Sequence, residues 1–178
     1  MHFDRRWGGP DAVSFPTLQD WSQHSDTRIR FYSGTATYHT TFAVAEPRDN
    51  NQRLVLDLGQ VAVMADVRVN DRPLGILWKP PFRVDVTDAL KPGNNVLEVR
   101  VVNLWINRMI GDQQLSEDSQ RNPDGTLQAW PQWVNEGKPS PAGRFTFTSW
   151  RLWQKDEPLQ PSGLLGPVRL LPVTRCRL

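Results

Sequence analysis

Alternation of apolar and polar residues between positions 34 and 102 is the feature that most constrains what this chain can fold into. In residues 34–45 one face would carry Ala36, Tyr38, Thr40, Phe42 and Val44, and the opposite face would carry Thr35, Thr37, His39 and Thr41. A period of two residues is that of a β-strand, whose successive side chains point to opposite faces. We therefore expect residues 34–45 to form a half-buried strand.

Further short strands, separated by turn-forming residues, follow the first. The NDRP run at 70–73 and the KPGNN run at 91–95 mark turns, because Asn, Asp, Gly and Pro favour turn backbone angles. Strands are predicted at residues 53–58, 63–69, 74–78, 82–86 and 96–102. In the last of these, Leu97, Val99 and Val101 are expected to face inward. Short strands and turns at this spacing predict an all-β fold, an antiparallel β-sandwich.

After Asn103 the alternation stops, and residues 104–143 are rich in Pro, Gly, Asn, Gln and Trp. An unstructured segment of that length is uncommon in a compact domain and is usually functional. Residues 144–151 and 168–172 again resemble strands, residues 130–136 are the best candidate for a helix, and no helix longer than about three turns is expected. The prediction is one sandwich domain, residues 1–178, with an N-terminal arm at 1–33 and a long Trp-rich loop insertion at 104–143.

Composition excludes several classes of partner. The 21 Lys and Arg against 19 Asp and Glu are scattered, so a pI of about 9.0 indicates no nucleic-acid-binding surface. The longest apolar run, residues 61–65, is far below the roughly 20 residues of a membrane span, so no membrane partner is expected. We expect a soluble chain, periplasmic or secreted only if a parent protein carries a signal peptide. The single Cys176 offers neither an internal disulfide nor a thiolate metal site.

Three motifs in the strand region carry a family likeness. They are VRVNDRPLG at 67–75, FRVDVT at 82–87 and LKPGNNVLEV at 90–99. Together they resemble the sugar-binding jelly roll of family 2 glycoside hydrolases, a galactose-binding-domain-like sandwich. Asp71 stands where that family usually has Gly, and we expect the turn to survive because Asp tolerates left-handed backbone angles.

The flanking motifs are more specific. They are WGGP at 7–10, YSGTATY at 32–38, WKPPF at 78–82, NLWINRMIGD at 103–112, FTFTSW at 145–150 and SGLLGPV at 162–168. They resemble the C-terminal end of glycoside hydrolase family 106, whose known activity is α-L-rhamnosidase. This resemblance implies a non-catalytic accessory domain, partnered with the catalytic barrel of a parent enzyme and contacting a rhamnose-containing glycan. The barrel that carries the family's catalytic carboxylates is absent from this chain.

The insertion also supplies the chemistry of a sugar site. A sugar presents an apolar C–H face and an edge of hydroxyls, so its site needs an aromatic platform and planar hydrogen-bonding groups. The residues predicted to bind carbohydrate are Trp105, Asn107, Arg108, Asp112, Trp130 and Trp133. The alternative for these residues is structural: a Trp packed in a core, polar side chains that cap loop backbone, or Asp112 paired with Arg108. A further alternative is that these residues form a surface that docks another domain.

Three further tryptophans, Trp7, Trp21 and Trp78, are interpreted as structural. Trp78 precedes a rigid Lys-Pro-Pro connector and is expected to pack in the core at the sandwich rim. Trp7 and Trp21 are expected to cover an edge of the sandwich from the N-terminal arm.

Catalysis by this chain alone is a weaker hypothesis. Glycoside hydrolysis needs two carboxyl groups across the scissile bond, and Asp112, Glu117 and Asp118 are the carboxylates near the Trp-rich segment. We read them as solvated or ion-paired loop carboxylates and assign no catalytic residue. A free-standing carbohydrate-binding module and a small autonomous glycosidase stay open as alternatives to an accessory domain.

The sequence assigns no cofactor. The three His residues are isolated from one another and the chain has a single Cys, so no transition-metal spacing is present. A structural calcium ion stays open, because calcium sites built from carbonyl and carboxylate oxygens leave little trace in a sequence.

Overall fold

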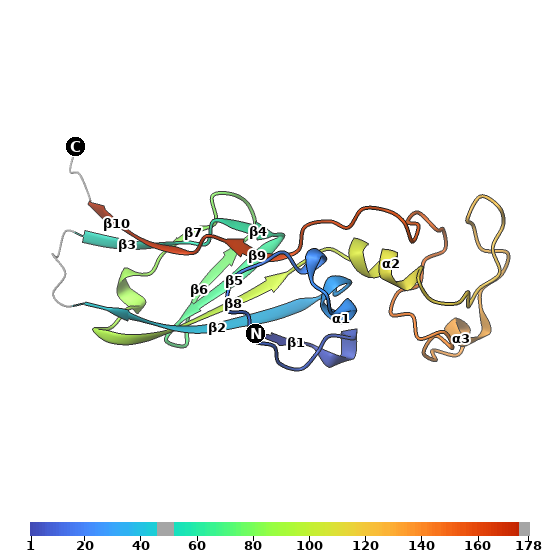
Figure 1. Ribbon diagram of the computed structural model, residues 1–178, viewed down its shortest axis with the longest axis horizontal. Coiled ribbons are helices and arrows are strands. Elements are labelled where there is room, and N and C mark those ends of the chain that lie inside the picture. The colour runs from blue at the N-terminus through green and yellow to red at the C-terminus, as the bar shows by residue number, and fades with distance from the viewer. Residues whose placement is uncertain (46–51, 175–178) are drawn as a thin grey trace.

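The computed structural model describes residues 1–45 and 52–174, so Cys176 lies outside the described residues. Strands dominate the chain (Figure 1). They are β1 (His2–Phe3), β2 (Thr35–Val44), β3 (Gln52–Asp57), β4 (Gln60–Ala62), β5 (Met64–Val69), β6 (Arg72–Leu77), β7 (Arg83–Asp85), β8 (Gly93–Val102), β9 (Gly163–Gly166) and β10 (Arg169–Thr174). The α-helices are α1 (Thr27–Arg30), α2 (Ile106–Asp112) and α3 (Gln132–Asn135), and 3-10 turns lie at Arg5–Trp7, Trp21–Gln23 and Thr87–Ala89.

The strands pair antiparallel into a sandwich, which confirms the predicted fold class. One sheet has the order β1-β2-β8-β5-β6, a second has the order β10-β3-β7, and β4 pairs with β9. The longest ladder joins β2 to β8, from Thr35 opposite Val102 to Val44 opposite Gly93. Leu97, Val99 and Val101 of β8 are all buried in the core, as their alternation predicted.

The hairpin between β5 and β6 forms as expected despite the Asp at its turn. Asn70 and Asp71 have φ angles of 49° and 64°, both in the left-handed region. Two central residues with positive φ match the twist of a two-residue hairpin, and Asn and Asp are the non-glycine residues that tolerate it best. Asp71 therefore replaces Gly without loss of the turn.

Two predictions about the segment after Asn103 are wrong. Residues 144–151 form no named strand among the described residues; only Trp150 makes an isolated bridge, to Thr126. Residues 106–112, expected as loop, form α2, which is the longest helix described. The helix predicted at 130–136 exists as the shorter α3, and all of the described helices are under three turns, as expected.

Trp78 and Trp21 do not lie where they were predicted. Trp78 is 65% exposed, so it is not the core residue that was predicted, and its ring lies under the Lys79 ammonium. Trp21 is fully buried in the core, where its Nε1 donates to the Tyr38 hydroxyl at 2.7 Å, rather than covering an edge. Trp7 is 40% exposed, while β1 of the same arm is the edge strand of the five-stranded sheet and pairs with β2.

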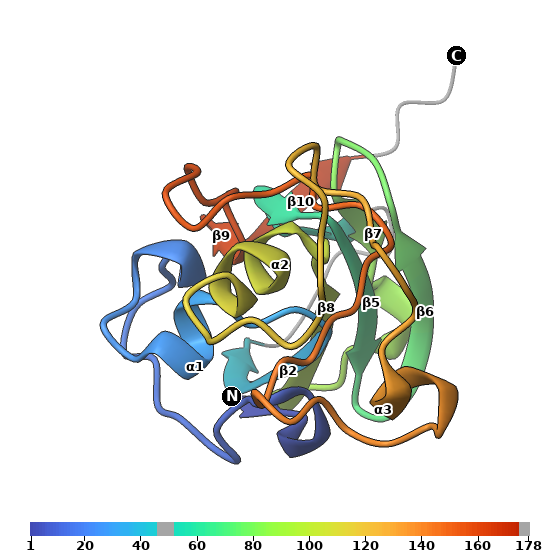
Figure 2. The ribbon, with the colours of Figure 1, turned by 90° about the vertical axis from the view of Figure 1, so that its right-hand side faces the viewer.

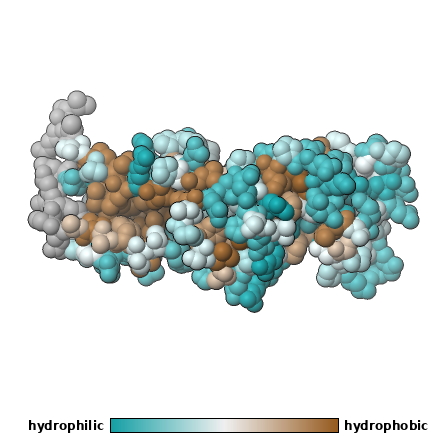
Figure 3. Space-filling view, viewed as in Figure 1, coloured by the Kyte–Doolittle hydropathy of each residue, from teal (hydrophilic) through white to brown (hydrophobic). Residues whose placement is uncertain are grey.

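The molecule is elongated, with the sandwich at one end and residues 104–160 at the other (Figure 1). The insertion thus comprises residues 104–160, which extend past the predicted limit at 143. Viewed along the long axis, α2 and the loops of the insertion cap the end of the two sheets (Figure 2). On the face drawn in Figure 3, hydrophobic colouring gathers over the sandwich and hydrophilic colouring over the insertion. No helix within the described residues is long and apolar enough to cross a membrane.

Candidate functional site

The insertion is fastened to the sandwich by α2, whose inward face is polar. Its buried residues are Asn107, Arg108, Ile110, Gly111 and Asp112. A Cβ built on Gly111 would lie 2.6 Å from Cγ of Phe31, so only glycine permits this close approach of α2 to the end of α1.

Asn107 joins α2 to the strand region through its amide. The Nδ2 group donates to the Gln160 carbonyl at 2.7 Å and to the Ser162 hydroxyl at 2.9 Å, while Oδ1 accepts from the Gln160 backbone amide at 2.7 Å. Asn103 has a similar role, because its Nδ2 donates to the Tyr32 carbonyl and its Oδ1 accepts from the Gly34 amide. Both asparagines satisfy buried backbone groups, and Asn107 is 1% exposed.

Asp112 and Arg108 form a buried pair one turn apart. Oδ2 of Asp112 accepts from the backbone amides of Phe145 and Thr146 at 2.9 and 2.7 Å and from the Thr146 hydroxyl at 2.8 Å. Its Oδ1 lies 3.8 Å from Nη1 of Arg108. Burial lowers the pKa of Arg108 below its ordinary value, while the charge of Asp112 and the proximity of Tyr32 oppose that shift.

Trp105 lies on the surface beside the start of α2. It is 46% exposed and meets the ring of Trp7 edge to face, with the centroids 5.3 Å apart. This geometry is favourable for an aromatic pair and leaves part of the indole open to solvent.

Trp130 and Trp133 lie together at the far end of the insertion, on and beside α3. Both contact Phe147, with ring centroids 5.4 and 5.5 Å apart. The Trp133 indole nitrogen donates to the Asp118 carbonyl at 3.0 Å, whereas Trp130 is 59% exposed. These tryptophans line an open groove with the side chains of Gln120, Gln132, Glu136 and Lys138.

A cleft of about 480 Å³ lies next to this groove, and Asp118 lines both hollows. Its aromatic walls are Phe147, Trp150 and Trp153. The Trp150 indole nitrogen donates to the Asp124 carbonyl at 3.0 Å, so the ring is anchored while 54% of the residue is exposed. The polar lining includes Gln113, Arg121, Arg144, Thr148, Ser149 and Arg151.

Arginine side chains hold the walls of the cleft in place. Arg121 donates to the carbonyls of Gly125 and Thr148 at 2.9 and 2.7 Å. Arg144 donates to the carbonyls of Leu115 and Ser116 at 3.1 and 3.0 Å. Burial lowers the pKa of Arg121, and the nearby Arg151 guanidinium lowers it further. The cleft therefore combines an aromatic wall with a dense set of cationic donors.

The carboxylates considered for catalysis are all engaged elsewhere. Glu117 pairs with Arg144, at 3.5 Å, and with Arg151. Asp118 accepts from the Ser140 hydroxyl at 2.6 Å and lies 3.8 Å from Nε of Arg144. Asp112 is 1% exposed and clamps the backbone at 145–146. Within residues 1–45 and 52–174 no group of three or more His, Cys, Asp or Glu side chains is arranged to hold a metal ion.

The six residues predicted to bind sugar thus fall into three places. Trp130 and Trp133 share the groove, and Trp105 lies on a separate surface with Trp7. The remaining three, Asn107, Arg108 and Asp112, are buried on the polar inward face of α2. The cleft residues that the prediction missed are Phe147, Trp150, Trp153, Arg121 and Arg151. The FTFTSW run at 145–150 carried a signal for Phe147 and Trp150, because its aromatic residues continue the Trp-rich composition beyond position 143.

Known proteins resemble the chain over most of its length. A putative β-glucuronidase of Formosa agariphila is 46% identical over 161 residues, which is 90% of this chain and 14% of that protein. The solved rhamnosidase of Novosphingobium sp. PP1Y is 34% identical with a TM-score of 0.78, over 97% of this chain and 14% of that one. The Bifidobacterium dentium β-glucuronidase, solved with coumarin-3-O-glucuronide, is 26% identical with a TM-score of 0.51, over 86% of this chain and 24% of that one.

The chain therefore spans about one seventh of the length of the putative glucuronidase and of the rhamnosidase. The sequence profile of the glycosyl hydrolase 2 galactose-binding domain-like family matches residues 19–140, which is more than half of the chain. That match includes β2 to β8, α2 and the groove around Trp130 and Trp133. Together with the antiparallel sandwich, the match places this chain in the glycosyl hydrolase 2 galactose-binding domain-like family.

Proposed function

We propose that this chain is a non-catalytic accessory β-sandwich of an α-L-rhamnosidase-like glycoside hydrolase, and that its insertion contacts a rhamnose-containing glycan. The observation that carries the proposal is the pair of adjoining hollows with Trp130, Trp150 and Trp153 in their walls. Aromatic faces beside planar polar groups are what a sugar ring requires.

The rhamnosidase likeness supports this assignment, because it extends over 97% of the chain. The insertion is therefore part of the shared architecture and not an addition peculiar to this protein. It also contains the features that separate this chain from a plain jelly roll, which are α2, α3 and the two hollows. We also propose that the parent enzyme belongs to the family 106 hydrolases. Its catalytic barrel would then be the domain that this chain contacts.

The charge pairing of the carboxylates favours a non-catalytic role. Glu117, Asp118 and Asp112 each face an arginine, and Asp112 also accepts three hydrogen bonds. A general acid or base must be positioned against a substrate proton, whereas these carboxyl groups already contact arginines and backbone amides of the chain itself. These carboxylates are therefore suited to hold the insertion together rather than to cleave a glycosidic bond.

A second candidate is an accessory domain of a β-glucuronidase-like enzyme. The putative β-glucuronidase of Formosa agariphila, at 46% identity, favours it. The two candidates share the domain type and differ in the parent's substrate. A free-standing carbohydrate-binding module is compatible with the same hollows.

Calorimetric titration with an oligosaccharide ending in α-L-rhamnose tests the proposal. We expect millimolar binding, weakened several-fold by Trp150→Ala and by Trp130→Ala, because one aromatic contact contributes on the order of 1 kcal/mol. The matched control is Trp78→Ala, which removes an indole of similar exposure from the sandwich and should leave the affinity unchanged. We also expect no cleavage of an aryl α-L-rhamnoside.

Equal binding by all three variants, or no binding by the wild type, would contradict a glycan contact in the insertion. Preferential binding of a glucuronide would favour the second candidate over the first.

A further inference from the structure

One edge of the Arg108 guanidinium has no hydrogen-bond acceptor among the described residues. The residue is 8% exposed, and its Nε and Nη2 atoms are buried yet donate to no acceptor among the described residues. Its Nη1 atom faces Asp112 at 3.8 Å. Buried donors are nearly always satisfied, so two unsatisfied donors on one buried group indicate a missing acceptor.

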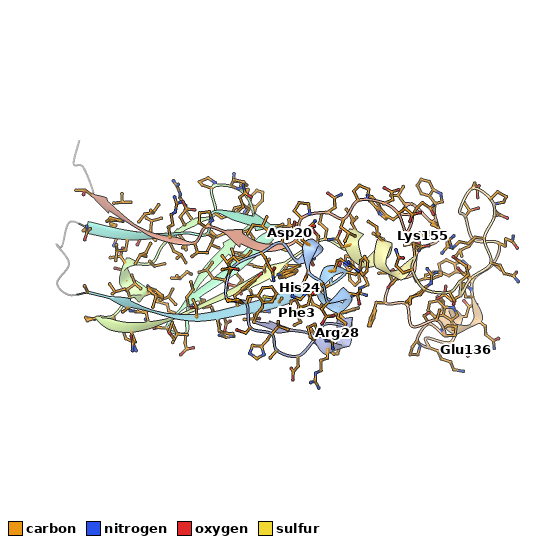
Figure 4. All side chains as sticks on the ribbon, in the orientation of Figure 1. Phe3, Asp20, His24, Arg28, Glu136 and Lys155 are labelled. Atoms are coloured by element: carbon orange, nitrogen blue, oxygen red, sulfur yellow. The ribbon has the colours of Figure 1, made fainter. Side chains whose placement is uncertain are left out.

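A cavity of about 550 Å³ lies beside this guanidinium, between α1, α2 and the segment at 145. Three arginines line it, Arg28, Arg30 and Arg108, with Asp112 as the acidic member of the lining. The Nε of Arg30 is likewise buried without an acceptor in the described chain. In Figure 4, Arg28 is labelled beside α1, where the sandwich meets the insertion.

The neighbouring groups leave one positive charge uncompensated. Arg28 is paired with Asp26 at 2.7 Å, and Arg108 faces Asp112. Arg30 has no carboxylate partner within the described residues; its guanidinium lies over the Phe31 ring, 5.0 Å from the centroid. Burial already lowers the pKa of Arg108, so a single negative charge in the cavity would stabilise both cations.

We propose that the cavity lined by Arg30 and Arg108 is a binding site for a carboxylate group. Nε and Nη2 lie on the same edge of a guanidinium, and that edge binds the two oxygens of a planar carboxylate through parallel hydrogen bonds. Phe31 and Phe145 supply apolar walls; the Phe145 ring lies 4.9 Å from the Arg108 guanidinium carbon and is 39% exposed.

This site is separate from the two aromatic hollows proposed for sugar. None of the residues that line the cavity also lines the cleft at Trp150 or the groove at Trp130. The proposal therefore does not depend on sugar binding in those two hollows.

Nuclear magnetic resonance of the arginine side chains tests it with sodium acetate as the probe. We expect the Nε–H signals of Arg108 and Arg30 to shift saturably, with an affinity on the order of millimolar. Arg30→Gln should weaken acetate binding about tenfold or more, since it removes a charge-assisted donor. Arg5→Gln removes the same charge from the surface, where Arg5 pairs with Asp11, and should leave the affinity within about twofold.

Shifts that sodium chloride reproduces at equal ionic strength would overturn the proposal, as would an acetate affinity unchanged by Arg30→Gln. Two further probes distinguish the source of the carboxylate. Tighter binding of a sugar acid than of acetate points to a glycan, and tighter binding of N-acetylaspartate amide points to an acidic protein side chain.

Discussion

The sandwich and the insertion are held together by different forces. The sandwich has one contiguous apolar core to which both sheets contribute side chains. None of the described residues 104–160 belongs to this core. The insertion instead relies on arginine side chains that donate to backbone carbonyls, on asparagine and aspartate clamps, and on a small group of aromatic contacts around Phe147.

This difference has consequences for stability. Burial of apolar surface is the largest favourable contribution to folding, so the sandwich is expected to unfold as one cooperative unit. A segment held mainly by polar contacts to its own backbone is expected to open at lower free energy. Changes on the surface of the insertion are therefore expected to leave the sandwich folded.

The largest expected effect is on the sandwich core. Trp21→Ala should lower the free energy of unfolding by about 3–5 kcal/mol, because the indole is fully buried and donates to Tyr38. Urea denaturation followed by circular dichroism measures the loss. Trp78→Ala serves as the control and should change stability by less than about 0.5 kcal/mol. A loss for Trp21→Ala no larger than for the control would refute a single cooperative core.

Alkaline pH should weaken the same core through Tyr38. Burial raises the pKa of Tyr38 to about 12, against the hydrogen bonds from Leu164 and Trp21 that lower it. The folded state then holds the phenol proton more tightly than the unfolded state, whose pKa is near 10. The stabilisation that Tyr38 provides is complete below pH ~10. The free energy of unfolding then declines by on the order of 2 kcal/mol as the pH rises to ~12. Unfolding free energies measured from pH 9 to 12 test it, and Tyr38→Phe should flatten the decline.

An intermediate effect is expected when the insertion loses its polar support. Arg144→Leu removes hydrogen bonds to the carbonyls of Leu115 and Ser116 and leaves Asp118 without its facing cation. We expect residues 115–153 to lose about 1–3 kcal/mol of hydrogen-exchange protection while β2 and β8 keep theirs. Lys138→Ala breaks only an exposed pair with Glu136 and should change protection little. Equal loss in both regions would mean that they unfold together.

The smallest effect is expected at Trp105. Because its ring is 46% exposed and rests on Trp7, Trp105→Ala should cost about 1 kcal/mol of stability rather than the 3–5 kcal/mol of a core tryptophan. Thermal melting of this variant and of Trp21→Ala compares the two losses of stability. A loss as large as that of Trp21→Ala would show that the surface pair of tryptophans is part of a core.

Local patterns account for the parts of the fold that were predicted. Alternation in β2 and β8 fixes which side chains face inward, since a strand has a period of two, and Asn70 and Asp71 tolerate the positive φ that the hairpin requires. These are properties of neighbouring residues, so a sequence displays them directly. The same patterns, with the family motifs, were sufficient for the domain type.

Alternation alone was not sufficient at residues 144–151. A strand also needs a partner with free backbone groups, and here the backbone of 145 and 146 donates to the Asp112 carboxylate instead. The helix α2 was missed for a related reason. Its buried face carries Asn107, Arg108 and Asp112, so the apolar stripe that normally reveals an amphipathic helix is missing.

The sequence by itself determined the domain type and the strands β2, β3, β5 to β8 and β10, because each depends on residues close together in the chain. Only the tertiary structure decided which tryptophans are buried and which polar residues support the backbone. Trp21 and Trp78 are the same residue type in the same domain, yet one is in the core and the other at the surface. Burial depends on contacts between distant segments, such as Trp21 with Tyr38 or Asp112 with residues 145 and 146, and no local pattern specifies those contacts.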